Sequence, residues 1–262
     1  SEAIQNMTGV NVISPTWFYV TDNNGNIINN ATADYVSLAH EKGLKVWGLV
    51  DNFTQDISTY EVLSRTSSRQ NLVSQLVNAA VGAGIDGINV DFEQLSEDVG
   101  VHFLEFLREL SIECHKNNLV LSVDNPVPED FTSHYDRAEQ GKVVDYVIIM
   151  GYDEHFAGGA AGSVASLSYV ENGIIDTLEE VPKEKLINSV PLYTRVWTEK
   201  DGKTTSKAYG ITAAQNWVEE NNVELTWQDN IGQYYGETEN ENGTQKIWME
   251  ETKSLGLKKD LV

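Results

Sequence analysis

Residues 86–93 of this 262-residue chain have the sequence DGINVDFE. If this run is a β-strand, its side chains alternate between two faces. The apolar residues at 88, 90 and 92 then share one face, and the other face carries Asn89, Asp91 and Glu93. Ionised carboxylates cost several kcal/mol each when they are buried without a partner. A fold does not need such a row, so the pattern indicates a functional reason for it.

An ordinary edge strand with a wet polar face is the alternative interpretation. Strands of parallel α/β proteins are seldom exposed on one face, which argues against it. Glu93 ends the run, and α/β barrels place their active sites at the C-terminal ends of strands. Two carboxylates two residues apart repel each other, so we expect the pair to share a proton near neutral pH. Glu93 is then the general acid, and Asp91 is its deeper partner.

Short β-rich runs alternate with helical patterns along the chain, which predicts parallel βαβ units and an α/β fold. The predicted strands are Gly9–Val20, Leu44–Val50, Gly87–Glu93, Leu119–Asp124, Val143–Tyr152 and Leu186–Thr194. Two of the intervening helices are predicted from apolar residues that recur on one face. These residues are Leu72, Val73, Leu76, Val77 and Ala80 in the first helix, and Val101, Leu104, Leu107 and Leu110 in the second.

The alternation of strand and helix patterns ends after Trp197. Residues from about 198 to 250 are polar and contain several glycines that signal turns, with one amphipathic helix near Ile211–Asn221. This region is predicted to be a small α+β insertion. The length suits one α/β barrel, so a single domain over residues 1–262 is predicted.

The composition is strongly acidic, with 40 Asp and Glu residues against 18 Lys and Arg and a formal net charge of -22. Such a surface repels phosphates and anionic lipid heads, so neither nucleic acid nor a membrane is a predicted partner. No apolar stretch is long enough to cross a bilayer. The single cysteine, Cys114, excludes an internal disulfide and is expected to be a small buried residue. The five histidines lack the spacing of a zinc hydrolase, and no G-x-S-x-G motif is present, so no metal or cofactor is predicted.

The run at residues 86–93 resembles the D-x-x-D-x-D-x-E signature of glycoside hydrolase family 18, the chitinases and their relatives. Asn89 stands where Asp is commoner, which resembles the SleL/YaaH-like branch of spore and cell-wall N-acetylglucosaminidases. Three further segments are similar to family segments and follow in the family's order. They are Ser14–Phe18, similar to the second strand, Met150–Asp153, similar to M-x-Y-D, and Pro191–Arg195, similar to P-x-Y-G-R with Thr194 in place of Gly.

The resemblance implies a TIM (β/α)8-type barrel, of which this chain is expected to lack the first and last strands. It implies cleavage of β-1,4 bonds after N-acetylglucosamine in peptidoglycan-type glycans, by a retaining, substrate-assisted mechanism. Glu93 would protonate the glycosidic oxygen, and the substrate's own acetamido oxygen would attack the anomeric carbon. Asp91 would orient and stabilise the acetamido group, and Tyr152 would donate a hydrogen bond to it.

Further residues are predicted to bind the sugar. These are Asn89, Met150, Asp153, Tyr193 and Arg195 within the family motifs, Trp17 by stacking, and Asn52 by its place near the mouth of the barrel. Simpler interpretations exist for some of them. Tyr152 and Tyr193 are also consistent with half-buried strand tyrosines, Arg195 with surface ion pairing, and both Trp17 and Trp197 with core packing.

The expected location is secreted or associated with the cell envelope or spore of a bacterium. The expected ligand is a polysaccharide containing N-acetylglucosamine. Open sheet edges would favour self-association. Two other functions remain open: a chitinase or endo-acting glycan hydrolase on the same fold, and a catalytically inactive carbohydrate-binding barrel.

Overall fold

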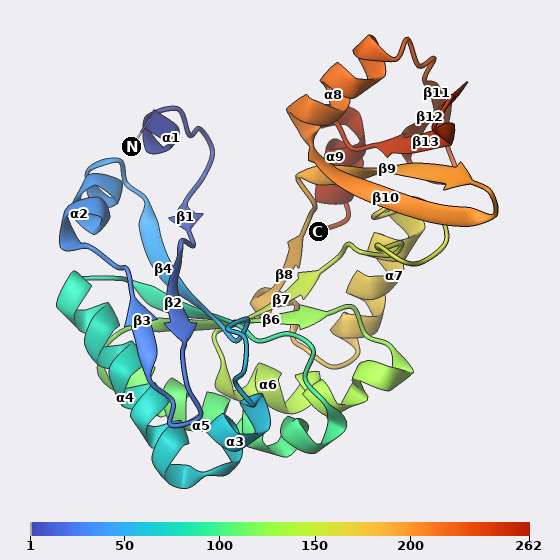
Figure 1. The fold of residues 1–262 in the computed structure, drawn as a ribbon. Helices are drawn as coiled ribbons and strands as arrows, with labels where there is room; N and C mark the ends of the chain where they lie inside the picture. The colour runs from blue at the N-terminus through green and yellow to red at the C-terminus, as the bar shows by residue number, and fades with distance from the viewer. Residues whose placement is uncertain (1) are drawn as a thin grey trace. The chain divides into compact units, whose positions relative to one another are not determined.

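The computed structural model describes residues 2–262, so Ser1, the first residue of the predicted domain, lies outside the described residues. The chain divides into two compact units, whose elements are labelled in Figure 1. The first unit contains the chain up to Ile148 together with Glu180–Ile187. The second contains Ile149–Glu179 and Asn188–Val262. The prediction of a single domain stays a prediction.

The predicted parallel βαβ arrangement is confirmed in the first unit. Strand β4 (Lys45–Asp51) pairs in parallel with β5 (Gly87–Asp91), and β5 pairs in parallel with β6 (Val120–Pro126). The sheet runs in the order β3-β2-β4-β5-β6-β7-β8, with β1 also beside β4. The other strands are β1 (Val12–Ile13), β2 (Thr16–Val20), β3 (Ile27–Asn29), β7 (Tyr146–Met150) and β8 (Leu186–Ser189).

Two of the predicted strands are interrupted, contrary to the expectation of continuous runs. The run at 9–20 forms β1 and β2, both parallel to β4, and the run at 186–194 forms β8 and the start of β9 (Tyr193–Lys200). Pro15 and Pro191 lie at the two breaks. Proline has no N–H to give to a strand ladder, which accounts for the interruptions.

The helices α3, α4, α5 and α6 lie along one side of the sheet in the first unit (Figure 1). The helix α4 (Thr66–Ala83) buries the whole predicted stripe from Leu72 to Ala80. It ends at Gly84, whose φ of 73° is the left-handed conformation that closes many helices. The shorter helices of this unit are α1 (Glu2–Gln5), α2 (Ala33–Glu41), α3 (Thr59–Ser64) and α6 (Arg137–Val143), with 3-10 turns η1 (Glu97–Val99), η2 (Asp130–Tyr135) and η3 (Lys183–Lys185).

The helix α5 (Gly100–Lys116) buries its predicted stripe except at one position. Leu104, Leu107 and Leu110 are buried, whereas Val101 is 71% exposed. Gly100 occupies the buried position of that first turn. A Cβ there would lie 2.3 Å from the carbonyl oxygen of His134, so no larger residue fits. Cys114 lies on the buried face of this helix, as predicted.

The second unit is built on a five-stranded antiparallel sheet in the order β10-β9-β13-β12-β11. Its remaining elements are α7 (Leu167–Leu178), β10 (Lys203–Gly210), α8 (Ile211–Glu220), β11 (Thr226–Gln228), β12 (Gln233–Asn240), β13 (Gly243–Met249) and α9 (Thr252–Lys259). Ala214 and Trp217 of α8 pack against Val196, Ile247 and Met249 of the sheet. The predicted helix and its strands are present, while their status as an insertion stays a prediction.

Candidate active site

The alternation predicted for residues 88–93 is present in the structure. Ile88, Val90 and Phe92 are buried on one face, and Phe92 stacks on Phe106 of α5 with ring centroids 5.6 Å apart. The strand itself ends at Asp91, so Glu93 lies two residues beyond β5 and not at its last position as predicted. The chain turns directly after Glu93, because the next residue has a φ of 53°.

Asn52 fixes the main chain of Glu93. It follows β4 and uses both ends of its amide: Nδ2 donates to the carbonyl of Glu93 at 3.1 Å, and Oδ1 accepts from the Glu93 N–H at 3.1 Å. The same Nδ2 also lies 3.0 Å from the hydroxyl of Thr59 at the start of α3. Asn52 was predicted from its place near the strand end, and the structure brings it against Glu93.

Asp91 is surrounded by other carboxyl groups. Asp51, the last residue of β4, lies opposite Asp91 in the register of the two strands and is only 4% exposed. Burial raises the pKa of Asp91 to about 6, and the charges of Glu93 and Asp51 contribute to the rise. Burial also raises the pKa of Asp51 above its ordinary value. The Oδ1 atom of Asp91 is buried and has no hydrogen-bond partner among the described residues.

Beneath Asp91 lies a second polar layer, which joins β5 to β6. Asn89 donates from Nδ2 to Oδ2 of Asp124 at 2.8 Å, and the hydroxyl of Ser122 donates to Oδ1 of Asn89 at 2.6 Å. All three side chains are buried. Burial raises the pKa of Asp124 to about 7, with Asp91 as the next cause, while the hydrogen bond from Asn89 opposes the rise.

The predicted residues of the second unit form a cluster of their own. Tyr193 begins β9 and donates a hydrogen bond to the carboxylate of Asp153, and its ring lies edge to face with Tyr152 at 6.2 Å. Burial and the bond to Asp153 raise the pKa of Tyr193 far above its ordinary value, so its hydroxyl remains a donor. Met150 is the last residue of β7, and the carbonyl of Tyr152 accepts from Tyr169 at 3.5 Å.

Arg195 lies two residues further along β9. Its Nη1 donates to the hydroxyl of Ser206 on β10 at 3.1 Å, and its Nε is buried without a partner within the described chain. Over residues 2–262 no carboxylate forms an ion pair with it, which weakens the interpretation of Arg195 as a surface ion-pairing residue.

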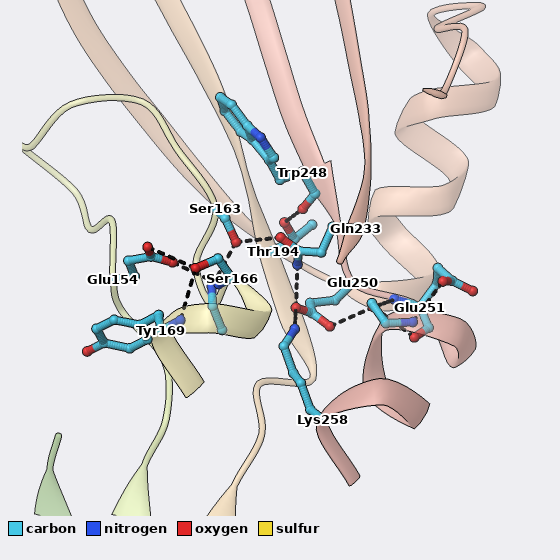
Figure 2. A network of polar contacts seen from close by, with 12 residues as sticks. Glu154, Ser163, Ser166, Tyr169, Thr194, Gln233, Trp248, Glu250, Glu251 and Lys258 are labelled. Carbon is cyan, nitrogen blue, oxygen red and sulfur yellow. Dashed lines mark hydrogen bonds and ion pairs between the residues drawn. The ribbon is translucent and has the colours of Figure 1, made fainter. Parts of the chain in front are cut away.

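The segment that follows Asp153 is held by buried polar contacts (Figure 2). The carboxylate of Glu154 accepts from the main-chain N–H of Ser166 at 2.7 Å and from its hydroxyl at 3.0 Å. Ser166 in turn caps α7 by accepting from the N–H of Tyr169. These bonds close the loop that carries Asp153 onto the first turn of α7.

A second chain of contacts in Figure 2 ties this loop to the sheet and to α9. The hydroxyl of Ser163 donates to Gln233, and the amide of Gln233 donates to Glu250. The ammonium of Lys258 also donates to Glu250, and both charged side chains are at most 1% exposed. The pair is therefore an ion pair inside the second unit.

No metal centre is indicated by the side chains that the structure describes. Among residues 2–262, no group of three or more His, Cys, Asp or Glu side chains is arranged to hold an ion. The helices of the same residues include none that is long and apolar enough to span a membrane.

The family description "Glycosyl hydrolases family 18" matches residues 12–262, which is nearly the whole chain. The chain belongs to glycosyl hydrolases family 18. Its resemblance to the family's motifs, stated from the sequence, is thereby confirmed.

Several similar proteins come from Bacillus subtilis (strain 168). The uncharacterized glycosylase YvbX is 28% identical over 211 residues, which cover 76% of this chain and 61% of YvbX. A cortical fragment-lytic enzyme is 23% identical over 252 residues, covering 91% of this chain and 58% of that enzyme. The chain thus spans about three-fifths of the length of these relatives. The crystal structure of the putative sporulation-specific glycosylase YdhD aligns with a TM-score of 0.89 at 26% identity, covering 95% of this chain and 86% of that structure.

The structure separates the predicted family 18 residues into two sets. Asn52, Asn89, Asp91 and Glu93 lie together in the first unit, and Met150, Tyr152, Asp153, Tyr193 and Arg195 belong to the second. Trp197 is explained by packing, whereas the predicted stacking of Trp17 on a sugar stays a prediction. Trp17 lies edge to face with Tyr35 of α2 at 5.3 Å, and Trp197 is fully buried and donates to the carbonyl of Gly162.

Sequence reasoning missed Asp51, Asp124 and Ser122 as members of the acidic site. A signal was present, because Asp124 ends a predicted strand and Asp51 directly follows one. Polar residues at the C-terminal ends of neighbouring parallel strands converge at one edge of the sheet. What the sequence does not supply is the register that sets Asp51 opposite Asp91.

Proposed function

We propose that this chain is a glycosidase that hydrolyses β-1,4 bonds after N-acetylglucosamine in peptidoglycan-type glycans. The observation that carries the proposal is the pair Asp91 and Glu93 at the end of β5, with the pKa of Asp91 raised to about 6 and its Oδ1 without a hydrogen-bond partner among the described residues. A carboxyl group that changes charge near neutral pH suits acid–base chemistry. Membership of family 18 supports a reaction at a glycosidic bond.

The proposed mechanism uses one protein acid and one group of the substrate. Glu93 gives its proton to the glycosidic oxygen as the bond to the anomeric carbon breaks, and the substrate's acetamido oxygen forms a bond to that carbon from the opposite face. Asp91 accepts a hydrogen bond from the acetamido N–H and stabilises the positive charge of the oxazolinium ion. Glu93 then takes a proton from water as the water oxygen bonds to the anomeric carbon and the bond from that carbon to the acetamido oxygen breaks, which gives a product of β configuration.

The residues that match the M-x-Y-D and P-x-Y-G-R segments are assigned binding roles in this proposal. Tyr152 is assigned the hydrogen bond to the acetamido group by its place in the M-x-Y-D segment. Asp153, Tyr193 and Arg195 are assigned contacts with the sugar. The hydroxyl of Tyr193 donates its proton to Asp153, so its oxygen is left as an acceptor, and the guanidinium of Arg195 supplies the donors for sugar oxygens.

The choice of peptidoglycan rests on the relatives. One similar protein is named a cortical fragment-lytic enzyme and another a putative sporulation-specific glycosylase, both from Bacillus subtilis. We therefore propose a bacterial, spore- or envelope-associated role.

As to the fold, we propose that the parallel strands belong to a (β/α)8-type barrel and that residues from about 198 to 250 are its α+β insertion. Self-association through sheet edges is proposed as well, and a single monomeric peak on a sizing column would contradict it.

Product analysis by mass spectrometry tests the proposal. The protein is incubated with peptidoglycan fragments and, separately, with chitin oligosaccharides. The matched variants are Glu93→Gln and the control Glu97→Gln, which changes an exposed acid in η1. We expect new N-acetylglucosamine ends from peptidoglycan with the parent and the control, and a rate lower by about 10²–10⁴-fold with Glu93→Gln. Proton NMR of the fresh product should show the β anomer.

Other outcomes separate the alternative functions. Cleavage of chitin oligosaccharides alone would assign the chain to chitinase activity. Retained binding of either glycan without any cleavage would identify a carbohydrate-binding barrel. Equal cleavage by Glu93→Gln and the parent would remove Glu93 from its assigned role.

A further inference from the structure

In the polar layer beneath Asp91, the carboxyl group lies on β6 and not at position 89 of β5. The family signature resembled by residues 86–93 commonly has an acid at position 89, and this chain has Asn89 there. A carboxyl group is nevertheless present in the same layer, at Asp124 on β6. Asn89 donates to it at 2.8 Å, and Ser122 donates to the other end of the Asn89 amide, which directs the NH₂ group towards Asp124.

We propose that Asp124 is a positioning residue that sets the charge of Asp91, supplying from β6 the carboxyl group that position 89 of β5 lacks. Asp124 acts here within the glycosidase described above, so this role rests on the proposed function. A fold has no need for a carboxyl group at this place: Asp124 is only 8% exposed, and an ionised carboxylate there is costly.

The two carboxyl groups are coupled through their charges. Burial raises the pKa of Asp124 to about 7, and the charge of Asp91 is the second cause. The pKa of Asp91 is raised to about 6. Asp124 is the more deeply buried of the two, so we expect Asp91 to lose its proton first as pH rises and the pair to carry one negative charge near neutral pH. The other titratable groups that face the pair are Glu93, Asp51 on β4 and Tyr135 on η2.

This order of ionisation matters for the reaction. While Asp124 keeps its proton, the single charge of the pair resides on Asp91, whose Oδ1 has no hydrogen-bond partner in the part of the chain that the structure describes. That charge is what the acetamido group requires. When Asp124 also ionises, a second negative charge enters the buried layer, and the electrostatics around Asp91 and Glu93 change. The pH dependence of the reaction should therefore contain a step that belongs to Asp124.

A titration that needs no activity tests the coupling first. Aspartate carboxyl groups labelled with ¹³C are followed by NMR in the parent, Asp91→Asn and Asp124→Asn. The signal absent from Asp124→Asn identifies Asp124. We expect its pKa to fall by about one unit in Asp91→Asn, since the like charge is removed. An unchanged Asp124 titration in that variant would overturn the coupling, whether or not the parent cleaves any glycan.

Kinetics with an exchanged pair test the role in the reaction. Asp124→Asn removes the charge at nearly constant shape, and Asn89→Asp/Asp124→Asn restores one acid and one amide in the reversed order. Asp176→Asn is the matched control, because it makes the same change at an exposed aspartate of α7. We expect kcat/KM of Asp124→Asn to stay close to that of the parent at about pH 5, where Asp124 keeps its proton, and to lack the pH step near 7.

The exchanged variant should regain a step near neutral pH, while Asp176→Asn keeps the pH profile of the parent. An unchanged pH profile in Asp124→Asn would overturn the role. So would an exchanged variant that restores no step, because the step would then not depend on a carboxyl group in this layer. Inactivity of the parent on every glycan would instead contradict the proposed function, and the NMR titration would still decide the coupling.

Discussion

Asn52 illustrates how a single side chain can control the main chain of a proposed catalytic residue. Its two hydrogen bonds to Glu93 are worth about 0.5–1.5 kcal/mol each, and they fix the direction in which the Glu93 side chain leaves the strand end. In Asn52→Ala we expect kcat to fall about tenfold with little change in KM, because the acid is misplaced while sugar contacts remain. Steady-state kinetics beside the control Asn78→Ala, an exposed asparagine of α4, measure this. Equal kcat values in both variants would contradict the positioning role.

Asp124 also makes a prediction about stability. It binds its proton more tightly in the folded chain than in the unfolded one, because its pKa rises from 3.8 to about 7. The folded state then holds more protons between these values, so the free energy of unfolding falls as pH rises from about 4 to 7. Asp124→Asn removes this loss. We expect the variant to be more stable than the parent at pH 8, by on the order of 2–4 kcal/mol, and nearly equal at pH 4.

Denaturant unfolding at several pH values provides the measurement. The control is Asp176→Asn, which changes an exposed aspartate of α7 and should follow the parent at every pH. A stability difference between Asp124→Asn and the parent that does not depend on pH would contradict the raised pKa.

At this scale the sequence predicted the alternation of Asn89, Asp91 and Glu93, because a strand's side-chain direction is a local property. It did not predict the bond between Asn89 and Asp124, which joins residues 35 positions apart through the pairing of β5 and β6. Which of several nearby carboxyl groups keeps a proton depends on burial and on those contacts. Hence the expectation that Glu93 holds the shared proton stays a prediction, while the raised pKa values belong to Asp91 and Asp124.

Among the elements, α9 is joined to the sheet of the second unit by the buried pair of Lys258 and Glu250. Lys258→Met would leave the carboxylate of Glu250 inside the protein without its cation, and we expect a cost of about 3–5 kcal/mol. Burial already raises the pKa of Glu250, and loss of Lys258 would raise it further. The destabilisation should therefore be larger at pH 8 than at pH 5, because the folded variant holds a proton that rising pH removes.

Thermal melts compare this variant with Lys259→Met, in which the lost ammonium is 80% exposed and should matter little. The double variant Glu250→Gln/Lys258→Met leaves no buried charge and should regain much of the lost stability. If Lys258→Met and Lys259→Met have the same melting temperature, the ion pair contributes nothing to holding α9.

Elements were predictable to the extent that their signals were long and periodic. The eighteen-residue helix α4 shows its stripe plainly, whereas β3 has three residues and gives no alternation to detect. The breaks at Pro15 and Pro191 were visible as residues, but whether a proline ends a strand or sits at its edge depends on the pairing around it. The exposure of Val101 follows from the helical period itself, because Val101 and Leu110 are nine residues apart and therefore lie on opposite sides of α5.

For the whole molecule, the order of the motifs along the chain is enough to indicate the family, because the fold fixes the sequence of strands that carry them.

The net charge is also a property of the whole molecule. The formal net charge is -22, and peptidoglycan fragments carry the carboxylates of their stem peptides, while chitin oligosaccharides are neutral. An acidic enzyme and an acidic substrate repel each other over about a Debye length, which shrinks from about 30 Å at 0.01 M salt to about 8 Å at 0.15 M.

Activity on peptidoglycan fragments should therefore rise with salt. We expect kcat/KM to increase several-fold between about 0.01 and 0.15 M NaCl, chiefly through a lower KM, since screening assists encounter and not the chemical step. Chitin oligosaccharides of similar length are the matched neutral substrate, and their hydrolysis should change little. An equal rise of kcat/KM with both substrates would mean that salt acts on the stability of the protein itself, because salt screens the repulsion within an acidic surface whichever ligand is present. A fall with peptidoglycan alone would indicate that local cations such as Arg195, and not the net charge, govern its approach to the site.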